Sequence, residues 1–203
     1  MRMTPCTAGV AAVIAVVALT SAACGGGPSA SSSGSPSTTS SQSPRASSSE
    51  STAPVDYTTL LIAAEDIQIP DEIFTMSQPQ ANPGGANGAA ASFDNEGGTR
   101  TISDSIIVMP DAAAAKTALD GGVAALNLSI AEPAPEPAAV GTEGVIASGP
   151  SPDGSRDVTV VTFFRGAAYV VMEFDSAAGD PVPADIAVAL AQKQADVIKA
   201  ALG

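Results

Sequence analysis

Residues 157–174, DVTVVTFFRGAAYVVMEF, determine the predicted fold, because two runs of β-branched and aromatic residues flank the turn at Arg165-Gly166. Side chains alternate between the two faces of a strand, so an even loop sorts the residues of both strands into two sets. The first face of this hairpin gathers Val161, Phe163, Val170, Met172 and Phe174. The second face gathers Val158, Val160, Thr162, Phe164, Tyr169, Val171 and Glu173.

The second face is still largely apolar, whereas an antiparallel sheet with one face in water alternates between apolar and polar residues. Something must therefore cover this face. One alternative is that two helices pack on opposite faces, or that a loop folds over the second face. Another is a patch for a protein partner. A third is a groove for an apolar ligand, lined by Val160, Thr162, Tyr169, Val171 and Glu173.

Further strands are expected on the N-terminal side of the hairpin. Residues 89–93 and 101–109 have strand patterns around the turn 94–98, and residues 145–148 form another strand before the turn 150–155. The strand after Arg165-Gly166 is expected to run from residue 168 to 174.

Two helices are expected. Pro110-Asp111 opens an Ala-rich helix that extends to about residue 126, in which Gly121-Gly122 predicts a break or distortion. The second helix is predicted from residue 184 to 202. One of its faces is expected to carry Ile186, Leu190, Val197 and Ala201.

The remaining segments are predicted to connect these helices and strands. Residues 57–67 predict a short helix or turn, residues 78–88 a loop, and the Pro-rich residues 132–137 a stiff connector. Strands followed by a helix, twice over, indicate an α+β domain over residues 55–203, with an antiparallel β-sheet, packed helices and two strand-strand-helix halves.

The N-terminus has the pattern of an export signal. Arg2 precedes an apolar run over residues 8–19, which is the length of a signal h-region and too short to span a bilayer. Residues 19–25, LTSAACG, resemble the lipobox of bacterial lipoproteins, although Ser21 stands where that motif prefers Leu. The resemblance implies that residues 1–23 are a signal peptide and that Cys24 becomes the acylated first residue, carrying chains such as palmitate.

Residues 24–54 are expected to form a disordered linker. Between Gly25 and Pro54 there are 13 Ser, 4 Gly, 4 Pro and 3 Thr among 30 residues, with no Val, Leu, Ile, Phe, Tyr or Met. Such a segment has no apolar surface to offset the entropy lost on ordering its backbone.

The whole chain resembles cell-envelope lipoproteins of mycobacteria, in its signal, its Ser-rich stalk and the patterns at 140–142, 152–155 and 163–174. The chain also resembles, more faintly and only in the order of its elements, the extracellular sensor domains of mycobacterial serine/threonine kinases. Those domains carry disulfides and tryptophans that this chain lacks, so no functional residue is carried over from them. The lipoprotein resemblance implies a protein anchored on the outer side of the cell membrane.

Composition excludes several functions. The chain has a formal net charge of −13, which opposes binding to nucleic acids. It has no His, and its two cysteines are Cys6, inside the signal, and Cys24. The inventory therefore offers no Cys or Ser-His nucleophile and lacks the usual ligands of zinc, copper and haem, so we expect no metal and no cofactor.

The sequence thus predicts a monomeric, acidic, lipid-anchored envelope protein that binds an apolar ligand or an envelope partner and is not an enzyme. One alternative is a hydrolase of envelope substrates that uses Asp/Glu pairs, because acid-base chemistry by carboxylates is the main chemistry that the inventory permits. Another is a structural or assembly accessory without a ligand.

Overall fold

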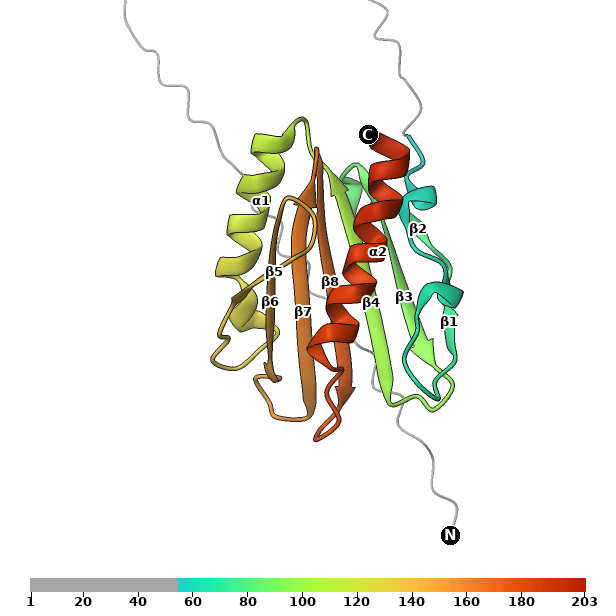
Figure 1. Cartoon of the computed structure of the whole chain (residues 1–203), viewed down its shortest axis with the longest axis vertical. Coiled ribbons are helices and arrows are strands. Elements are labelled where there is room, and N and C mark those ends of the chain that lie inside the picture. Colours follow the sequence, from blue (N-terminus) through green and yellow to red (C-terminus); the bar gives the residue numbers. More distant parts are fainter. Residues whose placement is uncertain (1–54) are drawn as a thin grey trace, which may run out of the picture. The chain divides into compact units, whose positions relative to one another are not determined.

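The hairpin over residues 157–174 lies at the centre of an antiparallel sheet in the computed structural model, which describes residues 55–203 (Figure 1). The predicted signal, Cys24 and the predicted linker lie outside the described residues. The strands of the sheet are β1 (Phe74–Met76), β2 (Gln80–Ala81), β3 (Gly88–Asn95), β4 (Arg100–Val108), β5 (Glu136–Ala138), β6 (Glu143–Pro150), β7 (Arg156–Arg165) and β8 (Ala168–Ala177). Their order is β1-β3-β4-β8-β7-β6-β5, and β2 pairs with β3 beside this path.

The register of the central hairpin confirms the predicted separation of its two faces. Val161 pairs with Met172, and Phe163 pairs with Val170, so the first-face residues lie side by side across β7 and β8. Arg165 pairs with Ala168, which leaves a two-residue turn. Gly166 in this turn has a φ of 57°, a left-handed conformation that glycine adopts at little cost.

The two helices pack on opposite faces of the sheet. On the first face, α2 (Ala184–Leu202) packs Leu190 and Ile198 into the main core, together with Phe163 and Met172. On the second face, α1 (Ala112–Ala124) packs its buried residues against Phe164 and Tyr169. The structure therefore matches the first of the alternatives for the cover of the second face. Neither helix within residues 55–203 combines the length and apolarity that a membrane crossing requires.

The predicted break in α1 at Gly121-Gly122 is wrong, because the helix continues to Ala124. The Asp111 carboxylate caps its first turn by accepting a hydrogen bond from the Ala114 N–H at 2.8 Å. Gly122 lies against the Tyr169 hydroxyl, and a Cβ at this position would be only 1.9 Å from that oxygen. The glycine thus allows the helix to approach the sheet closely, which explains why it is tolerated inside a helix.

The buried face of α2 differs from the predicted one. Leu190 is buried as expected, but Ile186 and Val197 are half-buried and Ala201 is exposed. Small side chains bring the helix axis close to the sheet, and Gln194 is buried because both ends of its amide have partners. The buried residues of α2 are Ala187, Leu190, Ala191, Gln194, Ala195 and Ile198.

The N-terminal residues of the described part complete the cover of the first face. As predicted for residues 57–67, they form short turns: the 3-10 helices η1 (Thr58–Leu60) and η2 (Ala64–Asp66). Their apolar side chains join the main core, including Leu60, Ile62, Ile67 and Ile69. We call α2 and residues 57–69 together the covering layer.

The predicted loops contribute to the edges of the sheet. Residues 78–88, expected as a loop, include β2 and the 3-10 helix η3 (Pro83–Gly85). The expected connector at 132–137 ends inside β5, because Glu136 pairs with Ile146 of β6. Edge strands of two or three residues expose few unpaired backbone groups, which disfavours pairing with another chain.

Candidate functional site

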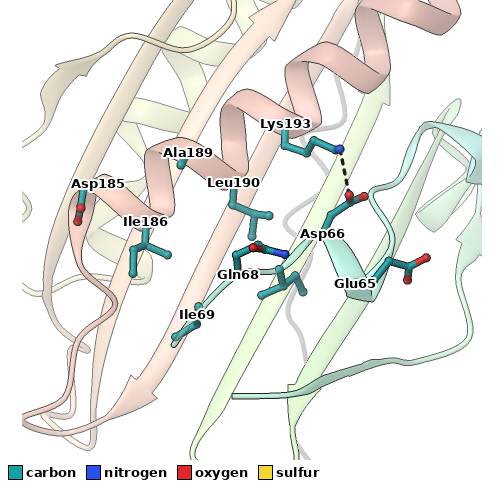
Figure 2. A pocket seen from close by; sticks show the side chains of 10 residues that line it. Glu65, Asp66, Gln68, Ile69, Asp185, Ile186, Ala189, Leu190 and Lys193 are labelled. Atoms are coloured by element: carbon teal, nitrogen blue, oxygen red, sulfur yellow. Dashed lines mark ion pairs between the residues drawn. The ribbon is translucent and has the colours of Figure 1, made fainter. Parts of the chain in front are cut away.

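An open pocket of about 390 Å³ lies within the covering layer, between α2 and residues 65–69 (Figure 2). One wall comes from η2 and the extended residues that follow it, and the other from the first half of α2. Its lining consists of Glu65, Asp66, Ile67, Gln68, Ile69, Asp185, Ile186, Ala189, Leu190 and Lys193. The pocket thus joins two segments that are more than a hundred residues apart in the sequence.

The floor of this pocket is apolar. Ile67 and Ile69 are each only 7 % exposed, and Leu190 is 5 % exposed, because all three also belong to the main core. Ile186 is half-buried, and Ala189 is exposed at the wall. Figure 2 shows Ile186 and Leu190 extending from α2 toward Gln68 and the extended segment. A ligand with an apolar part would therefore find a rigid surface, since the floor is held by the packing of the core.

The rim of the pocket is charged. Lys193 Nζ lies 3.0 Å from Asp66 Oδ1 (Figure 2). The Ala63 N–H donates to Asp66 Oδ2 at 3.1 Å. Burial raises the pKa of Asp66, but the hydrogen bond and charge of Lys193 and the bond from Ala63 outweigh it, so the pKa lies below its usual value. Glu65 and Asp185 form no ion pair with any residue of the range 55–203. The rim therefore carries an excess of two negative charges.

The buried side chain of Gln194 binds the backbone that leads into one wall of the pocket. Its Oε1 accepts a hydrogen bond from the Ile62 N–H at 3.0 Å, and its Nε2 donates to the Leu60 carbonyl oxygen at 2.6 Å. The amide thus provides both partners that a neighbouring strand would offer to this stretch of backbone. Since Gln194 is fully buried, the clamp excludes water and holds residues 60–62 against α2.

The site residues predicted from the sequence lie elsewhere, on the second face of the sheet. Val160, Thr162 and Tyr169 are buried, and Val171 and Glu173 are half-buried. Their cover is α1 together with the segment 126–130, which includes the 3-10 helix η4 (Leu126–Leu128).

Two polar groups on this face have partners within the fold. Thr162 Oγ1 donates to the Val170 carbonyl oxygen at 2.9 Å, and Ser129 Oγ donates to Glu173 Oε2 at 2.6 Å. Burial raises the pKa of Glu173, although the hydrogen bond from Ser129 acts in the opposite direction. The apolar and polar side chains that suggested a groove thus lie in the interior of a second packed layer. The segments α1 and 126–130 lie where the sequence analysis placed an apolar ligand.

Sequence reasoning missed the pocket because its walls meet only in the folded chain. The contact between Ile62 and Gln194 spans 132 positions, and no periodicity in either segment indicates which partner it has. One signal was present: Ile67 and Ile69 alternate with the polar Asp66 and Gln68, which is typical of an extended segment with one buried face.

Among residues 55–203, no group of three or more Asp, Glu, Cys or His side chains comes together as a metal site. Comparisons with protein-family models, curated proteins and solved structures found no match to this chain.

Proposed function

We propose that this chain is a lipoprotein of the cell envelope, anchored through acylated Cys24, whose domain binds an amphiphilic ligand in the pocket of the covering layer without catalysing a reaction. The observation that carries the binding role is an apolar floor held by the core beneath a charged rim. The anchor rests on the lipobox-like residues 19–25 and on the Ser-rich segment that follows them.

Replacing Cys24 by serine should leave the protein exported but no longer retained by the membrane, because the acylated sulfur is the only durable anchor that the sequence offers. Detergent-phase partitioning of the full-length chain measures this directly. Cys6→Ser is the matched control, since Cys6 lies inside the signal and is removed with it. Unchanged partitioning of Cys24→Ser into the detergent phase would contradict the anchor.

The size and lining of the pocket support a small-molecule ligand. Sites for such ligands commonly enclose about 300–1,000 Å³ and combine apolar walls with a few polar groups, and this pocket has a volume of about 390 Å³. The negative excess at the rim favours a ligand with an apolar body and a cationic head group. A short alkylammonium ion has this chemistry.

The carboxylates at the rim support binding better than catalysis. A general acid needs a raised pKa, and the pKa of Asp66 is lowered by its ion pair with Lys193. Asp104, Glu173 and Asp175 are the carboxyls whose pKa is raised, and none of them lines this pocket.

Replacing Ala189 by tryptophan should weaken binding of octyltrimethylammonium about tenfold or more, because the indole fills the pocket from an exposed position without disturbing the core. Isothermal titration of the full-length Cys24→Ser chain, which needs no detergent, measures the affinity. Octyl sulfate, with the same alkyl chain and an anionic head, should bind more weakly than the cation to the same protein.

Ala200→Trp is the matched control, because Ala200 is exposed on the same helix and does not line the pocket. This variant should bind the cation as tightly as the parent chain. Equal affinities in both tryptophan variants would exclude this pocket, and equal affinities for the two probes would exclude the charge preference.

A further inference from the structure

Asp104 is a carboxyl buried in the core of the sheet. It lies in the middle of β4 and is only 1 % exposed. Neither Oδ1 nor Oδ2 has a hydrogen-bond partner among residues 55–203. Buried polar side chains almost always have partners, so an unpartnered carboxyl in a packed interior calls for an explanation.

Asp104 occupies a position at which the alternation of β4 calls for an apolar residue. Ile102 and Ile106, two residues to either side on the same face, are fully buried in the main core. On the neighbouring strands, Asp104 pairs with Ala91 of β3 and with Met172 of β8. The same core contains Ile62, Ile67, Leu190 and Ile198, so the covering layer separates this part of the sheet from water.

Among residues 55–203, no charged group compensates Asp104. On its own strand, Arg100 lies at the end of β4 and is paired with Glu72 and Asp180. Asp94 of β3 and both Glu173 and Asp175 of β8 occupy strand positions that face the opposite side of the sheet. The titratable groups of the covering layer are half-buried or exposed at its margin: Tyr57, Glu65, Asp66, Asp185, Lys193, Asp196 and Lys199.

A carboxyl in such surroundings keeps its proton while the layer is closed. Burial raises the pKa of Asp104 from 3.8 to about 8. When the layer is open and water reaches the side chain, the carboxyl returns to its ordinary acidity. Deprotonation therefore favours the open state over the whole interval between these two values.

We propose that Asp104 makes the covering layer open in response to rising pH, because a deprotonated carboxylate at this position needs water that only an open layer admits. The two parts of the layer are linked to each other through Gln194, and both form walls of the pocket. Opening separates α2 and residues 57–69 from the sheet and removes the core packing that holds the pocket floor in place. The consequence for the ligand rests on the proposed function, whereas the opening itself does not.

Hydrogen exchange of the full-length protein in a mild non-ionic detergent tests the opening, with no ligand present. After correction for intrinsic amide exchange, the open population of the covering layer should rise about tenfold per pH unit between pH 5 and 8, since one proton is released on opening. The reporters are the buried amides of Ala191, Ala195 and Ile198 on α2 and that of Ile62. Amides of α1 on the other face should have a smaller open population at each pH, because they open only when the whole domain unfolds.

Asp104→Asn keeps the shape of the side chain and removes its titration, so the pH dependence of the covering layer should disappear in this variant. Asp104→Val, which introduces no polar group, gives a second test if the asparagine variant does not fold. A slope that persists in the folded variant, or no slope in the parent chain, would overturn the proposal. So would equal open populations of α1 and the covering layer at every pH, because both would then exchange through global unfolding and the layer would not open by itself.

Discussion

Replacing Asp104 by valine should raise the melting temperature at pH 7 by roughly 8–16 °C, which is the largest stabilisation that we expect from a single substitution in this chain. Valine has strong β propensity and supplies the apolar side chain that Ile102 and Ile106 flank. It also removes an unpartnered carboxyl from the core. The measurement is thermal unfolding of the full-length protein followed by circular dichroism.

The pH dependence follows from the direction of the pKa shift. The folded protein holds the Asp104 proton more tightly than the unfolded chain, so the contribution of this group to stability is greatest below its unfolded pKa of 3.8 and declines until about pH 8. The difference between pH 7 and the unfolded pKa of 3.8 corresponds to roughly 4 kcal/mol of lost stability. The gain from Asp104→Val should therefore grow as the pH rises from 4 to 8 and remain constant above it.

Ser103→Val is the matched control, because Ser103 is the neighbouring residue on β4, is half-buried and points to the other face of the sheet. It should change the melting temperature little and leave its pH dependence as in the parent chain. A destabilised Asp104→Val protein would mean that the carboxyl has a stabilising partner, and the burial argument would then fail.

Replacing Gln194 by leucine should lower the free energy of unfolding by about 2–5 kcal/mol, because it leaves the Ile62 N–H and the Leu60 carbonyl without partners in a dry interior. The side chains of both residues are buried, at 1 % and 2 % exposure, so water cannot replace the lost hydrogen bonds without opening the layer. Denaturant unfolding followed by circular dichroism gives the change.

The control is Gln192→Leu on the same helix. Gln192 is exposed, and the side-chain hydrogen bond that it donates to Asp196 is long, at 3.4 Å. We expect its effect on the free energy of unfolding to stay within about 0.5 kcal/mol. Similar losses in the two variants would show that leucine disturbs α2 in general and that the Gln194 clamp contributes little.

The centre of the fold could be predicted because its signals are local. The run Val158 to Phe164, the short turn and the run after it determine the register of β7 and β8, and a shift by one residue would move every side chain to the other face. The start of α2 at Ala184, after Pro183, follows equally local rules. Both elements have the bounds that the sequence indicates, or extend them by a few residues.

The candidate site could not be predicted, because it depends on which distant segments meet. The second face of the hairpin was expected to need a cover, and the sequence did not show that α1 supplies it. The carboxyl of Asp104 is visible as an exception in the alternation Ile102, Asp104, Ile106. Its significance emerges only from burial, since the same pattern in an exposed strand would place the carboxyl in water.

The position of η1 and residues 57–69 ahead of the sheet in the chain has a mechanical consequence. Residues 57–69 precede the first strand of the sheet, so a force applied to the domain from the N-terminal side acts first on η1 and on the backbone that Gln194 holds. Two side-chain hydrogen bonds and the apolar contacts of this segment resist that force before the sheet bears any load. A force applied in this way would thus act on one wall of the pocket before it acts on the sheet.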